Sequence, residues 1–496
     1  MSAHQTRRLV NNFAFLTVGY FFVRLITMIA TLYAARALGP DDYGGLSSGI
    51  NIALVLGVVA NLGLADYMVL AIARDPQESH TILGDAFLVK VAVVPFALLG
   101  ALLLRFYDPE FGLLFFIMII HGLFHSYLLL FWSVFRGLER MEFQTLLMVM
   151  QALIIAIGST VIIWLTKNAT LAATAYMIAS IATVAVGYVL LAKRGIRPTY
   201  RWQPEAWKQL LKTALPFGMI FVYLIIFDRL PAVLLPLLSP KADAGWYNSV
   251  YTITTVLMTI PSVILAVVIP LMARESQRNL KNVGQIANIV IKSTIIIGMG
   301  LALALFVLAP WLVPVLFGDA YLPSVKIMQI LAVSLPFSFL VIALVNVLEA
   351  VGHQNICARF TGYILLISIP ISYVFIWQWG YLGGAVAYLM NNVLLAGFLL
   401  WLARKIIGTI RLERAALLPL MAGLLPGLII YFLRQWPFYA LTPVAVLLYL
   451  VLLLLTGAVG APELAMVRQV LQSRGKPQPA PAAVPPVGNE DGTHLP

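Results

Sequence analysis

The chain has 496 residues, of which 61% are apolar and only 10% carry a charge. Soluble domains are about a quarter charged, so this chain has too few charges for the surfaces of the roughly three soluble domains that its length would allow. The single cysteine, Cys357, excludes a disulfide framework and any zinc or iron–sulfur site built from cysteines. We therefore expect an all-α, polytopic membrane protein.

A helix that crosses a membrane needs about 20 mostly apolar residues. Windows of that length predict about fourteen membrane-spanning helices, joined mostly by short connections that contain turn signals. In chain order the predicted spans are Phe13–Tyr33, Tyr43–Leu62, Ile82–Leu104, Phe111–Phe135, Thr145–Thr166, Leu171–Ala192, Leu215–Leu238, Trp246–Met272, Ala287–Phe306, Ser324–Leu348, Phe360–Trp377, Leu382–Leu402, Ala416–Phe432 and Thr442–Val459.

A weak internal repeat suggests how these helices are grouped. Tyr-Gly-Gly-Leu-Ser-Ser at 43–48 opens the second span and Ala-Gly-Trp-Tyr-Asn-Ser at 244–249 opens the eighth, and alignment of Gly44 with Gly245 gives an offset of 201 residues. Two related lobes usually enclose a site at their interface. The expected divisions are 1–192 for an N-terminal lobe of helices 1–6, 193–214 for a basic cytoplasmic linker, 215–404 for a C-terminal lobe of helices 7–12, 405–460 for helices 13 and 14, and 461–496 for a cytoplasmic, mostly disordered tail.

The distribution of basic residues predicts the orientation. With a cytoplasmic N-terminus and alternating spans, 23 of the 32 Lys and Arg residues lie inside, 6 lie outside and 3 lie within spans. Cytoplasmic loops carry such an excess. We therefore expect a multi-pass protein of the bacterial cytoplasmic membrane with both termini in the cytoplasm. The net charge of +12 then reflects basic loops beside an anionic leaflet rather than nucleic-acid binding.

Five ionisable residues fall within predicted spans, and we take them as candidate substrate-binding residues: Arg24, Asp85, Lys90, Asp228 and Arg229. Charges in hydrocarbon are costly and usually face a cavity or a partner. Interhelical ion pairs are the structural alternative, although Asp85 and Lys90 are five residues apart and need partners on other helices. Arg24 is the twelfth residue of its span, and basic groups outnumber acidic ones, so an anionic ligand such as a phosphate would balance the charge.

Other chemistry has little support in the sequence. His121 and His125 share a helix face, but no third metal ligand is evident, so we expect them to pack or to line a cavity. The chain lacks a Gly-x-x-x-x-Gly-Lys-[Ser/Thr] loop, a Gly-x-Ser-x-Gly elbow and a His-Glu-x-x-His helix. We expect no catalytic residues, no bound metal and no cofactor, and a protein that is not an enzyme.

Several motifs in order resemble the Wzx-type polysaccharide flippases of the multidrug/oligosaccharidyl-lipid/polysaccharide exporter superfamily. They are Ala-Arg-Ala-Leu-Gly-Pro-Asp-Asp-Tyr-Gly at 35–44, Phe-Arg-Gly-Leu-Glu-Arg at 135–140, Leu-Pro-Phe-Gly at 215–218, Gly-Trp-Tyr at 245–247 and Phe-Gly-Asp-Ala-Tyr at 317–321. The resemblance implies a V-shaped pair of lobes that flips an undecaprenyl-pyrophosphate-linked oligosaccharide for surface or exopolysaccharide synthesis. Relatives that flip the peptidoglycan precursor carry an arginine on the first helix, and Arg24 occupies the matching place.

Two other functions remain open at this point. A cation-coupled drug exporter of the same superfamily typically has twelve spans, and the last two predicted spans argue against it. A membrane glycan polymerase or ligase needs a large outer loop, and the outer loops here are about ten residues or shorter. The expected partners are the lipid bilayer, the undecaprenyl-pyrophosphate-linked glycan and, in the cell, a polysaccharide polymerase and export machinery.

Overall fold

The computed structural model describes residues 3–107, 111–276, 280–408, 421–423, 425–426 and 438–455. Within these ranges every regular element is a helix, which confirms the predicted all-α class. Nine of the described helices are long and apolar enough to cross a membrane. The helices are α1 (Ala3–Val59), α2 (Leu64–Arg74), α3 (Ser79–Tyr107), α4 (Gly112–Gly137), α5 (Met141–Thr166), α6 (Ala169–Lys193), α7 (Pro204–Leu238), α8 (Lys241–Leu257), α9 (Thr259–Ser276), α10 (Leu280–Phe317), α11 (Ser324–Ala350), α12 (Gln354–Ile407) and α14 (Phe438–Leu455).

Most predicted spans coincide with these helices, and two long helices each contain a pair of them. α1 includes the first two predicted spans and is broken at Gly39, where φ is 78°. α12 includes the eleventh and twelfth and is broken at Gly380, where φ is 52°. Glycine adopts such left-handed angles without steric cost. The chain therefore changes direction at a single residue where the sequence predicted a loop.

Three other elements differ from the prediction or fall outside the described residues. The eighth span is divided into α8 and α9 at Met258, and the short helix α2 lies in what was expected to be a loop. The predicted span 416–432 and the tail 461–496 lie largely or wholly outside the residues that the structure describes. α14 covers the described part of the fourteenth span and packs on α10, where the Tyr449 hydroxyl donates to the carbonyl of Ile296 at 3.0 Å.

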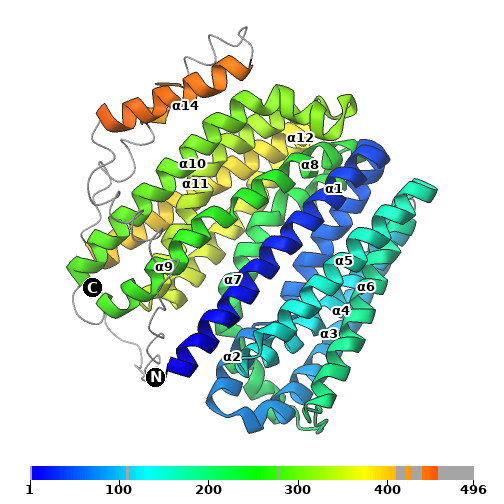
Figure 1. Cartoon of the computed structure of the whole chain (residues 1–496). Coiled ribbons are helices and arrows are strands. Elements are labelled where there is room, and N and C mark those ends of the chain that lie inside the picture. Colours follow the sequence, from blue (N-terminus) through cyan, green and yellow to red (C-terminus); the bar gives the residue numbers. More distant parts are fainter. Residues whose placement is uncertain are drawn as a thin grey trace.

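The N-terminal half, α1–α6, and the C-terminal half, α7–α12, lie side by side (Figure 1). They meet where the second part of α1 crosses α8. A Cβ atom on Gly44 would collide with the carbonyl of Lys241, and one on Gly245 would collide with the carbonyl of Pro40. Only glycine allows the two backbones to approach so closely. The residues that the repeat made equivalent are therefore in direct, reciprocal contact.

Further hydrogen bonds join the halves near the same end of the helices, which the charge distribution predicts to face outside. The Tyr321 hydroxyl donates to the carbonyl of Ala35 at 2.8 Å, and Arg36 donates to the carbonyl of Val315 at 3.3 Å. Within the C-terminal half, the backbone N–H of Tyr381, just after the break in α12, donates to the buried carboxylate of Asp243 at 3.0 Å. This end of the interface is closed.

At the opposite end, α7 lies against the N-terminal half. A Cβ on Gly63, in the turn between α1 and α2, would collide with the carbonyl of Ala214, and one on Gly218 would collide with Gly63. The linker before α7 also binds the start of α3, since Thr199 N–H donates to the carbonyl of His80 at 3.0 Å. α7 is thus in contact with the N-terminal half at the end that the charge distribution predicts to be cytoplasmic and, through α12 and α8, with the C-terminal half.

Candidate functional site

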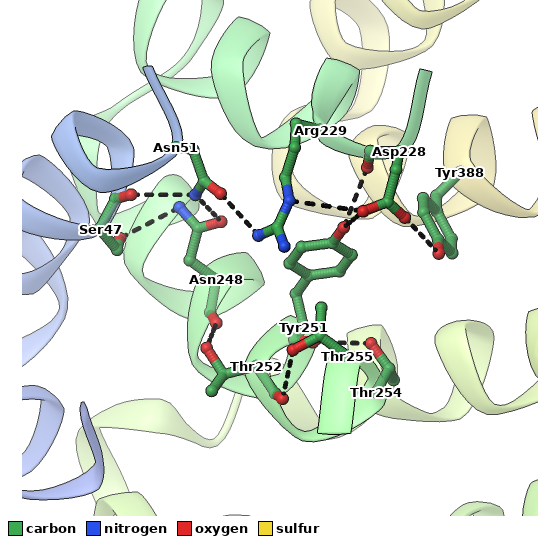
Figure 2. A network of polar contacts seen from close by, with 10 residues as sticks. All are labelled: Ser47, Asn51, Asp228, Arg229, Asn248, Tyr251, Thr252, Thr254, Thr255 and Tyr388. Carbon is green, nitrogen blue, oxygen red and sulfur yellow. Dashed lines mark hydrogen bonds and ion pairs between the residues drawn. The ribbon is translucent and has the colours of Figure 1, made fainter. Parts of the chain in front are cut away.

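The centre of the interface contains an adjacent acid and base on α7. The Asp228 carboxylate accepts hydrogen bonds from the hydroxyls of Tyr251 on α8, at 2.6 Å, and Tyr388 on α12, at 3.1 Å. Arg229 Nε lies 3.4 Å from Asp228 Oδ2, and Figure 2 shows the carboxylate between the two tyrosines and the guanidinium. The Asp228 side chain is 36% exposed and that of Arg229 only 16%, so the acid remains the more accessible member of the pair.

Arg229 is held by contacts from both halves. Its Nη1 donates to Asn51 Oδ1 on α1 at 2.9 Å, and its Cζ lies 5.0 Å from the centre of the Tyr251 ring. Among the described residues, no atom accepts a hydrogen bond from its buried Nε, whose nearest charge is Asp228. A buried guanidinium with one nearby carboxylate, an amide and an aromatic face is neutralised but retains unused donor capacity.

A second layer of uncharged polar side chains extends from Arg229 across the glycine crossing. Asn51 Nδ2 donates to Asn248 Oδ1 at 3.2 Å, and Asn248 Nδ2 donates to Ser47 Oγ at 3.0 Å. Ser47 and Asn248 are themselves separated by the repeat offset of 201 residues. The interface between the halves is therefore polar beside Arg229, although it lies within apolar helices (Figure 2).

Arg24 lies near this centre without being bonded into it. Its side chain is exposed, and it interacts electrostatically with Arg229, Asp228 and Tyr251. Its guanidinium forms no hydrogen bond or ion pair with any residue that the structure describes. Among the described residues at this centre, the cations Arg24 and Arg229 lie near one carboxylate, that of Asp228. The arrangement suits an anion with several oxygen acceptors, which arginine binds through a planar fork of donors.

The other two sequence candidates lie elsewhere, with partners on other helices as their spacing required. Lys90 is buried inside the N-terminal half, where Nζ donates to Asn61 Oδ1 at 3.2 Å and to the backbone carbonyl of Ser126. Asp85 lies near the N-terminal end of α3 and accepts a hydrogen bond from Trp207 Nε1 on α7 at 3.2 Å. The structure thus brings together Arg24, Asp228 and Arg229 and separates Asp85 and Lys90 from them.

The histidine pair also lies inside the N-terminal half. His121 Nδ1 is 2.7 Å from Ser180 Oγ and 3.0 Å from the carbonyl of Tyr176, and the ring of His125 lies edge-on to Trp132. Across the described residues, no group of three or more His, Cys, Asp and Glu side chains is placed to hold a metal ion. His121 is thus bonded to α6, and His125 packs on Trp132 within α4.

Sequence reasoning missed the neutral members of the site. Asn51, Asn248, Tyr251 and Tyr388 carry no charge, so nothing in the hydropathy pattern distinguishes them from other polar residues in membrane helices. The repeat offered one signal, because positions 47 and 248 are equivalent under the 201-residue offset and both are polar. The two tyrosines on α8 and α12 gave no comparable signal.

Comparisons with known proteins concern the family and the fold. A family model described as "Polysaccharide biosynthesis protein" matches residues 9–276, slightly more than half of the 496 residues. No relative was found among curated protein sequences.

Solved structures resemble the whole fold. The lipid II flippase MurJ in an inward closed conformation matches with a TM-score of 0.69 at 15% identity, over 88% of this chain and 97% of that one. An inward-facing multidrug resistance MATE family transporter of the MOP superfamily matches with a TM-score of 0.66 at 15% identity, over 78% and 94%. A mutant of the MATE transporter VcmN of Vibrio cholerae matches with a TM-score of 0.52 at 16% identity, over 82% and 98%. At such identities the likeness concerns the fold.

Proposed function

The chain belongs to the polysaccharide biosynthesis protein family and has the fold of MOP superfamily transporters, and from this premise we propose a specific cargo. We propose that it flips an undecaprenyl-pyrophosphate-linked oligosaccharide from the inner to the outer leaflet of the bacterial cytoplasmic membrane. In this proposal the two halves alternate in exposing a cationic centre to the two sides. The protein is a transporter, and its cargo serves surface or exopolysaccharide synthesis.

One observation carries the proposal: among the described residues, two cations, Arg24 and Arg229, lie near one carboxylate, Asp228, in the region where the two halves meet, and Arg229 alone is paired with it. A cation in a membrane helix is costly unless a partner compensates its charge. A pyrophosphate supplies negative charge and several acceptor oxygens at once. The excess of cations is therefore accounted for by a phosphate-bearing ligand and left unexplained by a cationic drug.

The two arginines would act differently on the head group. Arg229 is fixed by Asn51 and Asp228, which pre-orients its free donors. Arg24 is exposed and unbonded among the described residues, so it is free to close on a phosphate oxygen. The charged head and the strongly hydrated glycan would then cross the membrane beside polar groups of the protein instead of through about 30 Å of hydrocarbon. The polyprenyl tail would stay in lipid.

Asp85 and Lys90 take other roles in this proposal. Asp85 fastens the start of α7 to α3 through Trp207. Lys90 is buried within the N-terminal half, where it is bonded to Asn61. The head-group site is therefore assigned to Arg24, Arg229 and the polar residues around Asp228. Polysaccharide polymerase and export proteins are the partners expected to receive the flipped product.

Proteoliposomes that contain a defined lipid-linked oligosaccharide test the function. We expect the wild type and the matched control Arg404→Ala, which replaces an exposed arginine at the end of α12, to flip the lipid. Arg24→Ala should lose most of this activity, by about tenfold or more. Ion-gradient-driven transport of a cationic drug without lipid flipping would instead support an exporter, and glycan elongation would support a polymerase.

A further inference from the structure

A groove lies between α7 and the first part of α12, and none of the residues assigned to the head-group site lines it. Its volume is about 470 Å³, within the range of sites that bind small molecules. Met219 and Tyr223 line it from α7, and residues between Asn355 and Leu366 line it from α12. Water would find few polar partners along most of this surface, so we expect a chain of apolar atoms to fill it.

The groove exists because two of the α12 residues that line it are small. Ala358 and Gly362 are four positions apart and therefore lie on the same side of the helix. A Cβ atom on Gly362 would come within 3.0 Å of the Tyr223 ring, so the ring rests directly on this glycine. The Tyr223 hydroxyl in turn donates to Met219 Sδ at 3.6 Å. Larger side chains at positions 358 and 362 would fill the space.

The groove has the length of one leaflet and two unlike ends. From Asn355 to Leu366 it extends about 16 Å along α12, roughly half of a hydrocarbon core of about 30 Å. Asn355 and Arg359 lie at the end that the charge distribution predicts to be cytoplasmic, and Leu365 and Leu366 lie at the other. A lipid of the cytoplasmic leaflet has the same order, with a polar head at the surface and apolar chains beneath it.

The polar end of the groove carries a positive charge. Arg359 is exposed and, within the described ranges, forms no hydrogen bond or ion pair. Glu349 on α11 interacts with Cys357, which lies on another side of α12 from Arg359 because two helical residues span about 200°. α12 begins at Gln354 and no described side chain caps it, so the partial positive charge of the helix N-terminus adds to that of Arg359.

The charge at this end fits one phosphodiester. Arginine binds phosphate oxygens through a planar fork of donors, and a phosphodiester carries a single negative charge, which one guanidinium balances. A pyrophosphate brings more negative charge than one guanidinium balances. The extra cation of a zwitterionic head group would lie beside Arg359, which has no acidic partner among the described residues. The charge balance therefore favours an anionic phospholipid over both alternatives.

We propose that the groove between α7 and α12 binds an anionic phospholipid of the cytoplasmic leaflet. Its phosphate lies at Arg359 and one acyl chain lies along Gly362 and Leu366, while the second chain stays in the bilayer. The lipid packs against the helix that carries Asp228 and Arg229, so it stabilises the contact of that helix with α12. The proposal does not depend on which cargo is transported.

Native mass spectrometry of the purified protein counts the lipids that stay bound. We would titrate phosphatidylglycerol and phosphatidylcholine with identical acyl chains. The wild type should bind one phosphatidylglycerol at least about tenfold more tightly than phosphatidylcholine. Arg359→Gln should lose this preference, because a hydrogen bond to a charged group is worth about one factor of ten. Arg404→Gln, which removes an exposed arginine in the last turn of α12, should retain it.

Two tryptophan variants test the apolar end of the groove without a change of charge. Leu366→Trp adds bulk at a residue that lines the groove, and Ile367→Trp adds the same bulk at an exposed neighbour outside it. Only Leu366→Trp should weaken the binding of phosphatidylglycerol, by several-fold. A phosphatidylglycerol with a photoreactive acyl chain should label Met219 or α12 near position 366 in the wild type.

Thermal unfolding gives an independent readout, because a ligand that binds the folded protein raises the midpoint. Phosphatidylglycerol should raise it in the wild type and Arg404→Gln, and less in Arg359→Gln. Equal affinities of the wild type and Arg359→Gln, or photolabelling spread evenly over the lipid-facing helices, would overturn the proposal. Displacement of phosphatidylglycerol by an equal concentration of undecaprenyl phosphate would also overturn it and would assign the groove to the polyprenyl carrier.

Discussion

Arg229 illustrates what a cation needs in order to be buried within a membrane protein. It has a carboxylate at 3.4 Å, an amide oxygen at 2.9 Å and an aromatic face at 5.0 Å. Apolar residues of similar volume often replace a buried ion pair without loss of stability. The pair is therefore poorly explained by stability alone, and its position between the halves is consistent with a role in ligand binding.

Asp228→Asn tests the electrostatic part of this view. The amide oxygen still accepts from a tyrosine hydroxyl, but the negative charge beside Arg229 is lost. We expect undecaprenyl pyrophosphate to bind several times more tightly, because the carboxylate no longer repels the head group, and flipping to slow because release becomes harder. Titration of the purified protein and the flipping assay measure the two effects.

Tyr388→Phe serves as the control for that substitution. It removes one hydroxyl donor to Asp228 and keeps the charge, so stability should fall by about 1 kcal/mol with little change in affinity. Weaker binding by Asp228→Asn would contradict the electrostatic account and would indicate that the carboxylate accepts hydrogen bonds from the ligand.

The charged residues of the site were predictable from sequence and the neutral ones were not. A charge inside an apolar window stands out because its transfer into hydrocarbon is costly. Asn51 and Tyr388 can occur in any membrane helix, and only the fold brings them to Arg229. The sequence likewise could not show that Lys90 lies inside the N-terminal half and Arg24 near Asp228, because it shows only that both residues fall within predicted spans.

At the level of the helices, glycine placement determines which segments can approach. Gly44 and Gly245 let α1 and α8 cross with their backbones in contact, and Gly63 and Gly218 do the same for the turn at 60–63 and α7. Gly39 and Gly380 allow abrupt changes of direction within long helices. At these two crossings the backbones are in direct contact, so there is little tolerance for added volume.

Gly245→Ala tests the outer crossing. The added methyl group would meet the carbonyl of Pro40, so the closed arrangement should be disfavoured by about 1–3 kcal/mol. In a Cys357→Ser background, a cysteine at position 248 should then react faster with a membrane-impermeant thiol reagent added from outside. Gly397→Ala, where a methyl group would meet nothing within 4 Å, should leave the rate unchanged. Equal rates for both variants would show that the crossing does not form the outer closure.

The limits of the sequence-based prediction at this level have physical causes. Pro40-Asp41-Asp42 was taken as a loop, but proline and acidic residues also suit the first turn of a helix, and the chain is helical again from Pro40 onward. α2 has 11 residues, too few to span a membrane, so a search for spans could not find it. The break at Met258 has no signal in hydropathy, but Pro261 has no N–H to donate to the carbonyl of Leu257, where α8 ends.

For the whole molecule, the repeat of 201 residues corresponds to a physical contact between equivalent positions. Ser47 and Asn248, which the repeat aligns, are hydrogen-bonded to each other. Composition and periodicity were sufficient for the all-α class, whereas the packing of one half against the other depends on side-chain shape. In the structure the crossing of α1 and α8 is closed, and the proposed alternation of the two halves requires that crossing to open.

A cysteine pair tests that requirement. Ser47→Cys with Asn248→Cys, in a Cys357→Ser background, places two thiols across the crossing where a short bifunctional thiol reagent or oxidation can join them. Joining should abolish flipping, and for the oxidised pair reduction should restore it. Each single variant should be unaffected by the reagent. Undiminished flipping by the fully joined protein would show that the halves transport without separating here.

The central claim is that Arg24 and Arg229 together bind the pyrophosphate of a lipid carrier. Its most direct test is titration of purified wild type, Arg24→Ala and Arg404→Ala with undecaprenyl pyrophosphate and with uncharged undecaprenol. We predict that wild type and Arg404→Ala bind the pyrophosphate equally, that Arg24→Ala binds it at least about tenfold more weakly, and that undecaprenol binds weakly to all three. Equal affinity of Arg24→Ala and wild type for the pyrophosphate would contradict the account.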